Sequence, residues 1–235
     1  MFNDLFRWCE DISQFATDRP INDISDEITK EVLVEGSCIH RSPYCDKTCF
    51  NIKLYKLYPN MLKRDIRIEK AWQALTPENI HKNIANFFQR KRKQIKRIRF
   101  NTRGESLKDI ADIYRVKAMC TAMPDTEWWL PTRAWSDPIM KVQIEQELMP
   151  LPNLALNAST DPSTTKEEWE MLNRDGWNIM FYGDDELNHD PATGKYMFQC
   201  PKTKKGMKGH CEICKGGCFS QTTIGKRRTI KLYQH

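Results

Sequence analysis

The chain has 235 residues, of which 40% are hydrophobic, so it can bury a core and wholesale disorder is excluded. It contains no apolar stretch long enough to span a bilayer, and residues 1–11 lack the apolar run of a signal peptide. These features predict a cytoplasmic protein with no membrane partner. In that reducing compartment the nine cysteines are candidates for metal ligands rather than for disulfides.

Positive charge is concentrated in two segments of a chain whose net charge is +6. Seven Lys and Arg residues lie within Arg90–Arg99 with no acid among them. The segment from Lys202 to Lys231 contains nine Lys and Arg residues and a single acid, Glu212. Blocks of this kind favour nucleic acid or another polyanion as a partner. A solvated helix face, with counter-charge for an anionic metal cluster in the tail, is the competing interpretation.

The first third of the chain is predicted to be largely helical. Apolar residues at helical spacing predict a helical lead-in over residues 1–30: Leu5, Trp8, Cys9, Ile12 and Phe15. Residues 31–35 are expected to form a short buried strand that leads directly into the first cysteines. Two helices follow at about 58–75 and 78–94, and Thr76 with Pro77 is a typical cap and first-turn pair for the second.

Strands and helices alternate with short turns after residue 95. Strands are expected at 95–101, 127–132, 153–158 and 177–182, and helices at 106–123, 136–149 and 163–173. This alternation predicts parallel βαβ units and an α/β fold. Because a closed eight-unit barrel needs about 250 residues, we expect a partial (βα) barrel of about five or six parallel strands over residues 31–183. Residues 184–235 lack this periodicity and are expected to form a basic, cysteine-rich, metal-binding extension.

Polar residues follow several of the predicted strands. Gly104 and Glu105 come after the strand at 95–101, Arg133 comes after 127–132, and Asn157 and Ser159 close 153–158. The carboxyl ends of parallel strands meet at one edge of a sheet, where α/β proteins build their sites. We therefore expect these five residues to share a site with the cysteines that follow residue 35.

Three cysteines lie close together in the first group, Cys38-x6-Cys45-x3-Cys49. Thiolates prefer soft metals, and such a short loop can wrap one centre at little entropic cost. A cluster usually has four ligands, so either His40 or Cys120 completes the shell or one iron stays open to an exogenous ligand. Zinc with His40 as its fourth ligand, or buried structural thiols, are the alternatives.

The second group, Cys200-Pro-x9-Cys211-x2-Cys214-x3-Cys218, supplies four thiolates. Two of them share one turn, and a Gly-Gly pair before the last cysteine lets the backbone double back. Four thiolates suit either zinc or a [4Fe-4S] cluster, and the spacing alone favours neither. The two remaining cysteines fall on apolar helix faces and are interpreted as core thiols.

Several segments resemble one phage family. The stretch 36–50, with its Cys-x6-Cys-x3-Cys motif followed by an aromatic residue, resembles the opening of the phage "gene product 88" proteins. The resemblance covers about residues 30–220 and continues through Arg97–Glu105, Trp128–Arg133, Leu154–Ser159 and the terminal Cys-Pro…Cys-x2-Cys-x3-Cys-Phe. The cysteine spacings are its specific part.

The chain also resembles the radical S-adenosylmethionine (SAM) enzymes. Those have a partial barrel, a three-cysteine cluster loop after the first strand and a Gly-Gly-Glu motif after the second. The resemblance implies a [4Fe-4S] cluster on Cys38, Cys45 and Cys49. It also implies a second cluster in the tail, for which zinc is the alternative.

The same resemblance implies that SAM binds the open iron. Glu105, beside Gly104, would accept from its amino group and Arg133 would bind its carboxylate, with Asn157 and Ser159 also in the cofactor site. The implied function is redox or radical SAM chemistry supported by an electron donor. A non-catalytic iron–sulfur or zinc protein that binds nucleic acid or a host partner through its basic segments is the alternative.

Overall fold

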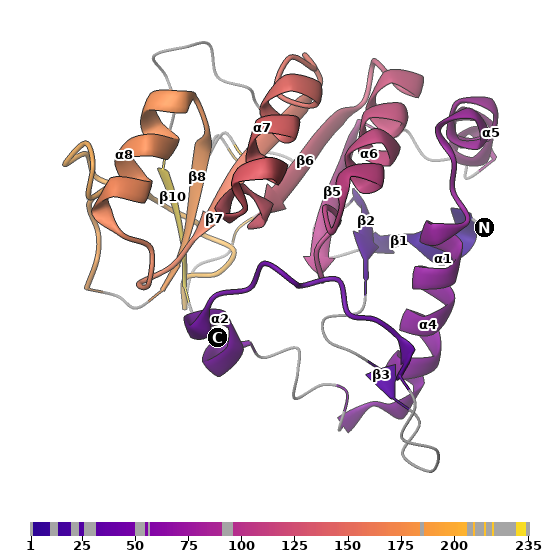
Figure 1. Cartoon of the computed structure of the whole chain (residues 1–235), viewed down its shortest axis with the longest axis horizontal. Coiled ribbons are helices and arrows are strands. Elements are labelled where there is room, and N and C mark those ends of the chain that lie inside the picture. Colours follow the sequence, from indigo (N-terminus) through magenta and orange to yellow (C-terminus); the bar gives the residue numbers. More distant parts are fainter. Residues whose placement is uncertain are drawn as a thin grey trace.

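One large β-sheet organises the protein, and helices cover one of its faces (Figure 1). The computed structural model describes residues 2–9, 14–19, 24–25, 32–49, 55, 57–90, 96–183, 186–205, 209, 214, 218 and 229–233. The sheet has eight strands in the order β1-β2-β5-β6-β7-β8-β10-β9. All neighbours are parallel except β1 and β2, which leaves seven parallel strands in a sheet that does not close into a barrel.

The strands of this sheet are β1 (Phe6–Cys9), β2 (Gln14–Asp18), β5 (Arg97–Arg103), β6 (Glu127–Thr132), β7 (Leu154–Thr160), β8 (Asn178–Gly183), β9 (Phe198–Gln199) and β10 (Thr229–Tyr233). A separate antiparallel pair consists of β3 (Ile24–Ser25) and β4 (Val32–Val34). The helices are α1 (Phe2–Leu5), α2 (Pro43–Thr48), α4 (Pro59–Gln73), α5 (Pro77–Gln89), α6 (Ile110–Ala122), α7 (Pro138–Glu147) and α8 (Lys166–Asp175), with the 3-10 helix η2 (Ala134–Ser136).

Local sequence signals set the ends of the three helices that link neighbouring parallel strands. Asp109, Asp137 and Thr165 each accept a backbone N–H from the first turn of the helix that follows. In α8 this contact is part of a capping box with Glu168, and the helix ends at Gly176, whose φ is 100°. These signals keep α6, α7 and α8 short enough for compact βαβ units.

The hydrophobic core lies between the sheet and these helices. Every second side chain of the central strands belongs to it: Ile98, Phe100, Trp128, Leu130, Leu154, Leu156, Ala158, Ile179 and Phe181. Within it the rings of Phe100 and Trp128 stack with centroids 5.0 Å apart. The intervening side chains, such as Asn101, Asn157 and Ser159, face the opposite side of the sheet. This side is therefore polar and available for a site.

The alternation predicted for residues 95–183 is confirmed. Its four strands and three helices all form, and β6 has the predicted limits. The helices after β5 and β7 start later than predicted because Asp109 and Thr165, rather than Ser106 and Ser163, cap them. The α/β class is also confirmed, although the sheet is open and has seven parallel strands instead of about five or six.

The helical lead-in predicted for residues 1–30 is wrong in the part that the structure describes. Only Phe2–Leu5 is helical, and β1 and β2 follow it. Pairing of β2 with β5 makes β2 the first parallel strand, so tertiary pairing overrides the local apolar spacing. The strand predicted at 31–35 forms as β4 but pairs with β3 and with no other described strand. The first cysteine group therefore belongs to the crossover from β2 to β5.

The described part of residues 184–235 returns to the sheet instead of forming only an extension. β10 pairs with β8, and β9 pairs with β10. Lys231 of β10 is buried, and its Nζ donates to Oδ1 of Asn188 at 3.2 Å. In the part of the chain that the structure describes, no helix has the length and apolarity needed to cross a membrane.

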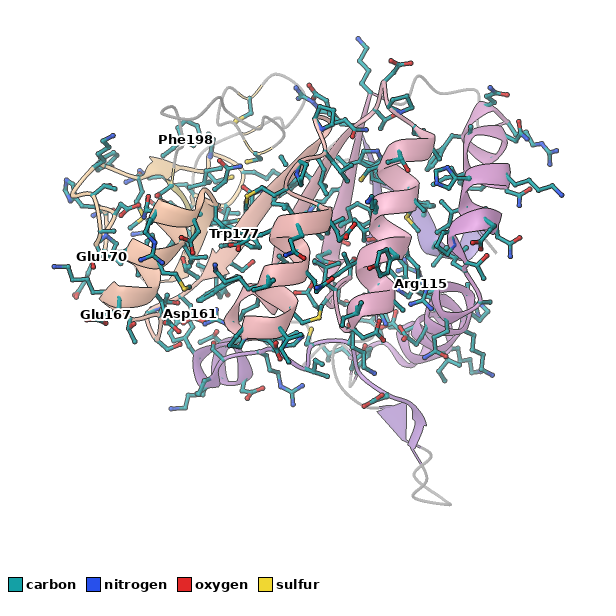
Figure 2. All side chains as sticks on the ribbon, turned by 45° about the horizontal axis from the view of Figure 1, so that its top comes forward. Arg115, Asp161, Glu167, Glu170, Trp177 and Phe198 are labelled. Atoms are coloured by element: carbon teal, nitrogen blue, oxygen red, sulfur yellow. The ribbon has the colours of Figure 1, made fainter. Side chains whose placement is uncertain are left out.

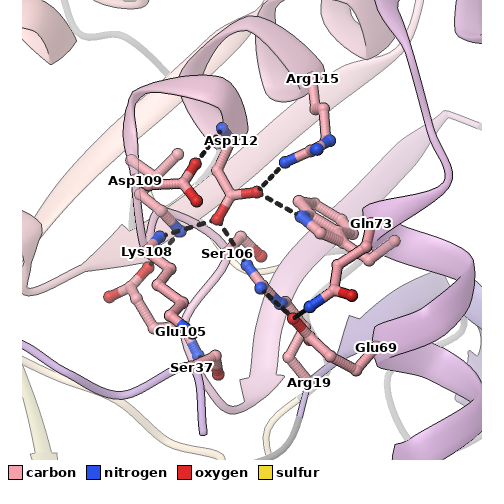
Figure 3. A network of polar contacts seen from close by, with 12 residues as sticks. Arg19, Ser37, Glu69, Gln73, Glu105, Ser106, Lys108, Asp109, Asp112 and Arg115 are labelled. Carbon is pink, nitrogen blue, oxygen red and sulfur yellow. Dashed lines mark hydrogen bonds and ion pairs between the residues drawn. The ribbon is translucent and has the colours of Figure 1, made fainter. Parts of the chain in front are cut away.

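A buried ion-pair network joins the end of β2 to α4 and α6 (Figure 3). Arg19, which is 2% exposed, donates to the Glu69 carboxylate at 2.8 and 2.7 Å and to Oδ2 of Asp112 at 2.7 Å. Asp112 also accepts from the indole of Trp72 and the guanidinium of Arg115. Burial opposes charge on both groups, but the contacts outweigh it, so the pKa of Arg19 is raised and that of Asp112 lowered.

The turn after β5 packs directly on the backbone of Arg19. The Arg19 N–H donates to the carbonyl of Arg103 at 3.0 Å, which continues the pairing of β2 with β5. Gly104 has a φ of +76°, and a Cβ at this position would lie 2.4 Å from the Arg19 carbonyl oxygen. The backbone N–H of Glu105 then donates to Oγ of Ser37 at 2.9 Å. Glycine is therefore required at 104, and the network fixes where Glu105 lies.

Replacing Arg19 tests how much the network stabilises the fold. Arg19→Ala should lower the free energy of unfolding by about 3–5 kcal/mol, because two carboxylates lose their buried cation. Arg97→Ala removes the partner of the half-exposed Glu127 and should cost about 1 kcal/mol or less. Since the pKa of Asp112 lies below its ordinary value of 3.8, its contribution to stability is complete above that pH and declines as the pH falls from 3.8 through the lowered pKa. Urea titrations at pH 7 and pH 3 measure both effects, and equal losses in the two variants would contradict this account.

Two glycine variants separate backbone strain from steric exclusion. Gly104→Ala and Gly194→Ala both place a Cβ at positive φ, which costs about 1–2 kcal/mol. Only Gly104 has a close neighbour, because nothing lies within 4 Å of a Cβ at Gly194. The melting temperature should therefore fall further for Gly104→Ala. Similar decreases would show that the turn can shift away from Arg19 at no cost.

Candidate metal and ligand site

A cavity of about 240 Å³ lies at the carboxyl ends of the central strands, against the first cysteine group. Its walls come from the ends of β5, β6, β7 and β8, from β10 and from the loop that carries the cysteines. Six of the residues predicted from the sequence line it: Cys38, Cys45, Gly104, Glu105, Arg133 and Ser159. The cavity thus brings four of the five predicted strand-end residues together with Cys38 and Cys45, while Asn157 and Cys49 lie outside the described lining.

Two serines anchor the cysteine loop to the sheet edge. Ser37, directly before the first cysteine, is buried and accepts the N–H of Glu105 at 2.9 Å. Ser42 caps α2 by accepting the N–H of Cys45 at 3.0 Å, and its hydroxyl donates to the Asp161 carboxylate. Asp161 lies close to α2 at the lower edge of the molecule in Figure 2. These contacts tie the thiols to the ends of β5 and β7.

The three thiols of the loop influence one another. Burial, followed by the charges of Glu105 and Cys49, raises the pKa of Cys38 to about 12. A hydrogen bond with the Cys49 thiol and then burial raise the pKa of Cys45, while the Arg133 guanidinium opposes this shift. Both thiols are therefore neutral at pH 7 in the metal-free protein. A metal that binds them must displace a proton from each.

Other candidate ligands near the loop differ in their surroundings. His40 lines the cavity, and among the described residues its buried Nε2 has no hydrogen-bond partner. Cys120 is completely buried in α6, and burial raises its pKa well above the ordinary 9.0, which confirms it as a core thiol. In the described ranges, no three His, Cys, Asp or Glu side chains surround a position for a single metal ion.

Glu105 lies where it was predicted, but the protein already uses its carboxylate. One oxygen accepts from Nδ2 of Asn101 at 2.9 Å and from the N–H of Leu107 at 3.1 Å, and the other accepts from the N–H of Arg133 at 3.0 Å. Thr132 adds a side-chain hydrogen bond. Four donors match the roughly four lone-pair sites of a carboxylate. Burial outweighs these four hydrogen bonds and raises the pKa of Glu105. Through its bonds to Leu107 and Arg133, the carboxylate joins the turns after β5 and β6.

Arg133 is held in place at the cavity wall. Its Nη1 lies 2.7 Å from Oδ2 of Asp161, and its guanidinium carbon lies 5.9 Å from the ring centroid of Trp135. The indole N–H of Trp135 donates to the carbonyl of Ser159 at 2.9 Å. The charge of Arg133 also partly offsets the rise in the pKa of Cys45, so Arg133 interacts electrostatically with the cysteine loop. The end of β6 thus presents a fixed cation to the thiols.

Cationic groups outnumber carboxylates in the cavity lining. Arg99 of β5 stacks on Trp129 of β6, with its guanidinium carbon 4.4 Å from the ring centroid. The lining contains three guanidinium groups and two carboxylates: Arg41, Arg99 and Arg133 with Glu105 and Asp161. Such a lining favours anionic contents, for example a thiolate-bound metal centre.

The second cysteine group is described only in part. Cys200 follows β9, and its N–H donates to the carbonyl of Lys231 at 2.9 Å. The carbonyl of Cys218 accepts from Nδ2 of Asn157 at 3.3 Å, which places this cysteine against β7. Asn157 is completely buried and lies outside the described cavity lining. Cys211 lies outside the described residues, and a shared metal for Cys200, Cys211, Cys214 and Cys218 stays a prediction. Residues 91–95 of the basic segment Arg90–Arg99 also lie outside them, and nucleic-acid binding stays a prediction.

The sequence analysis missed the residues that hold the site together. Ser42 precedes Pro43, a typical helix start that could have identified it as a cap. Asp161 directly follows β7, so the rule that selected Ser159 could have selected it as well. Arg19 has no local signal, because its partners Glu69 and Asp112 lie 50 and 93 positions away.

Comparison with known proteins gives one family. Residues 21–231 match the family described as Gene product 88. No curated protein and no solved structure matches the chain, so the comparisons do not support the resemblance to radical SAM enzymes. The matched range includes both cysteine groups and most of the chain. The chain therefore belongs to the gene product 88 family, the phage family expected from its cysteine spacings.

Proposed function

We propose that this protein is an iron–sulfur redox protein that holds a [4Fe-4S] cluster on Cys38, Cys45 and Cys49. The observation that carries the proposal is the convergence of these thiols beside the cavity at the sheet edge. Cys38 and Cys45 line the cavity, and Cys49 is hydrogen-bonded to Cys45. Three cysteines leave one iron without a protein ligand, and the cavity provides space for an exogenous one.

The donor set suits one soft-metal centre. The three thiols are near enough to shift each other's pKa, so they can serve the same centre. Three thiolates suit iron–sulfur ligation, and the nearby carboxylates of Glu105 and Asp161 already bind protein donors.

Residues of the cavity would stabilise the thiolates once protons have left. The pKa values of both thiols are raised overall, but the charge of Arg41 opposes the rise at Cys38 and that of Arg133 opposes the rise at Cys45. When bound, the cluster would supply one-electron chemistry, with a potential set by such neighbouring charges. Asp161 pairs with Arg133 and so moderates this positive field. An electron donor is the implied partner.

Radical SAM chemistry is a second candidate for the same site. It is favoured by the shared lining, because Arg133, Glu105 and Ser159 border the same cavity as Cys38. The lone pairs of Glu105 are already occupied, so the amino group of SAM would have to replace a protein donor. At about 240 Å³ the cavity is also smaller than the roughly 300–1,000 Å³ of pockets for drug-sized ligands, so the cysteine loop would have to open.

The tail supports a further part of the proposal. The contact of Cys218 with Asn157 puts this one cysteine of the second group on the face of the sheet that carries Ser159. A second cluster there, or zinc as the alternative, would lie on the same side as the first. In the non-catalytic alternative the protein would bind nucleic acid or a host partner through Arg90–Arg99 and its basic tail.

Metal analysis of cysteine variants tests the first cluster. Cys38→Ala, Cys45→Ala and Cys49→Ala should each lose about one cluster's worth of iron and sulfide, since two thiolates rarely hold a cubane. Cys120→Ala, a thiol in the core, should keep the wild-type iron content. Iron, sulfide and zinc are measured on protein purified without oxygen. A wild-type protein that carries zinc and no iron would exclude the cluster.

Paramagnetic resonance of the reduced protein tests the radical SAM candidate. Adding SAM should change the spectrum of the first cluster if SAM binds the open iron. Arg133→Gln should weaken this change, whereas Arg97→Gln, which lies outside the described lining, should not. If the wild-type cluster is present but indifferent to SAM, radical SAM chemistry is excluded and the iron–sulfur proposal stands.

A further inference from the structure

We propose that Ser42 is a positioning residue for the metal centre and acts through Asp161. Its hydroxyl links the helix that carries Cys45 to the end of β7. This inference rests on the proposed function, because it concerns the cluster held by the cysteine loop. It adds a residue that is neither a metal ligand nor part of the cavity wall.

The position of α2 depends on polar contacts. This helix has six residues, and none of them is buried, so apolar packing does not fix it on the sheet. Ser42 itself is only 7% exposed, accepts the N–H of Cys45 at 3.0 Å and donates to Oδ2 of Asp161. An edge contact between the rings of Tyr44 and Tyr182, with centroids 6.5 Å apart, is a further link between α2 and the sheet.

Asp161 is a rigid acceptor for this contact. It is 3% exposed, and its Oδ1 accepts from the N–H of Ser163 at 2.8 Å. The oxygen that receives the Ser42 hydroxyl also lies 2.7 Å from Nη1 of Arg133. One carboxylate therefore holds both α2 and the cavity cation relative to the end of β7.

Besides the contact between Tyr44 and Tyr182, two serine hydrogen bonds hold different cysteines of the described loop. Cys38 follows Ser37, which is bonded to the backbone of Glu105 at 2.9 Å, whereas Cys45 and Cys49 depend on Ser42. Removing the Ser42 hydroxyl would break the second of these hydrogen bonds and leave the first intact. Cys45 and Cys49 would then move relative to Cys38, which would loosen a cluster without unfolding the sheet.

The experiment compares cluster loss from full-length variants reconstituted with iron and sulfide. Ser42→Ala should release iron to a chelator about tenfold or more faster than the wild type, a typical effect of losing a residue that orients metal ligands. Ser42→Thr keeps the hydroxyl and should retain the wild-type rate. Thr76→Ala is the matched control, because Thr76 caps α5 in the same way, before a proline, and lies outside the described cavity lining.

The spectrum of the reduced cluster is a second readout. Ser42→Ala should change it and Thr76→Ala should not. If the wild type holds no cluster, the proposed function fails first. If the wild type holds one and Ser42→Ala matches Thr76→Ala in rate and spectrum, this inference is overturned while the cluster stands. If Ser42→Ala folds poorly, Asp161→Asn tests the same contact from its other side. It should also speed iron loss, and a wild-type rate in that variant would overturn the inference too.

Discussion

The buried cation of Arg19 is the constraint on which the site depends. It lies at the end of the first parallel strand and binds carboxylates from two helices, Glu69 and Asp112. A buried charge without partners is so unfavourable that these elements have to assemble together. The backbone of Arg19 also fills the space beside Gly104, which admits no side chain. The network therefore determines the turn that carries Glu105 into the cavity wall.

The crossover from β2 to β5 brings the cysteines to the sheet edge from outside the sheet. β4, which precedes them, pairs with β3 and with no other described strand, so the described pairing in the main sheet does not position the loop. Ser37 contributes a contact to the turn after β5, and Ser42 contributes one to the residue after β7. Side-chain contacts, rather than strand pairing, therefore bring the described thiols to the strand ends.

Sequence patterns predicted the parts of the fold whose signals are local. Apolar strands such as Trp128–Leu130 alternate with capped helices, and turn polarity at Gly104, Arg133 and Ser159 identified the edge that forms the cavity. β2 could not be predicted in this way, because a strand of mixed polarity is decided by its partner β5 rather than by its own residues. The Arg19 network was equally inaccessible, since its members are distant in sequence and each is an ordinary charged residue. The occupied lone pairs of Glu105 could not be predicted for a related reason: its neighbours, not its strand position, determine them.

The electrostatics of the cavity are consistent with the proposed metal centre. Burial keeps the thiols of Cys38 and Cys45 neutral, and the buried Nε2 of His40 has no partner among the described residues. Guanidinium groups nearby, of which Arg133 is the best placed, favour negative charge at the same thiols. A bound cluster would hold the cysteines as thiolates, and its negative charge would interact favourably with these guanidinium groups. It would also occupy the space beside the loop. In the proposed metal-bound protein, the centre would offset part of the cost of burying polar groups at this edge.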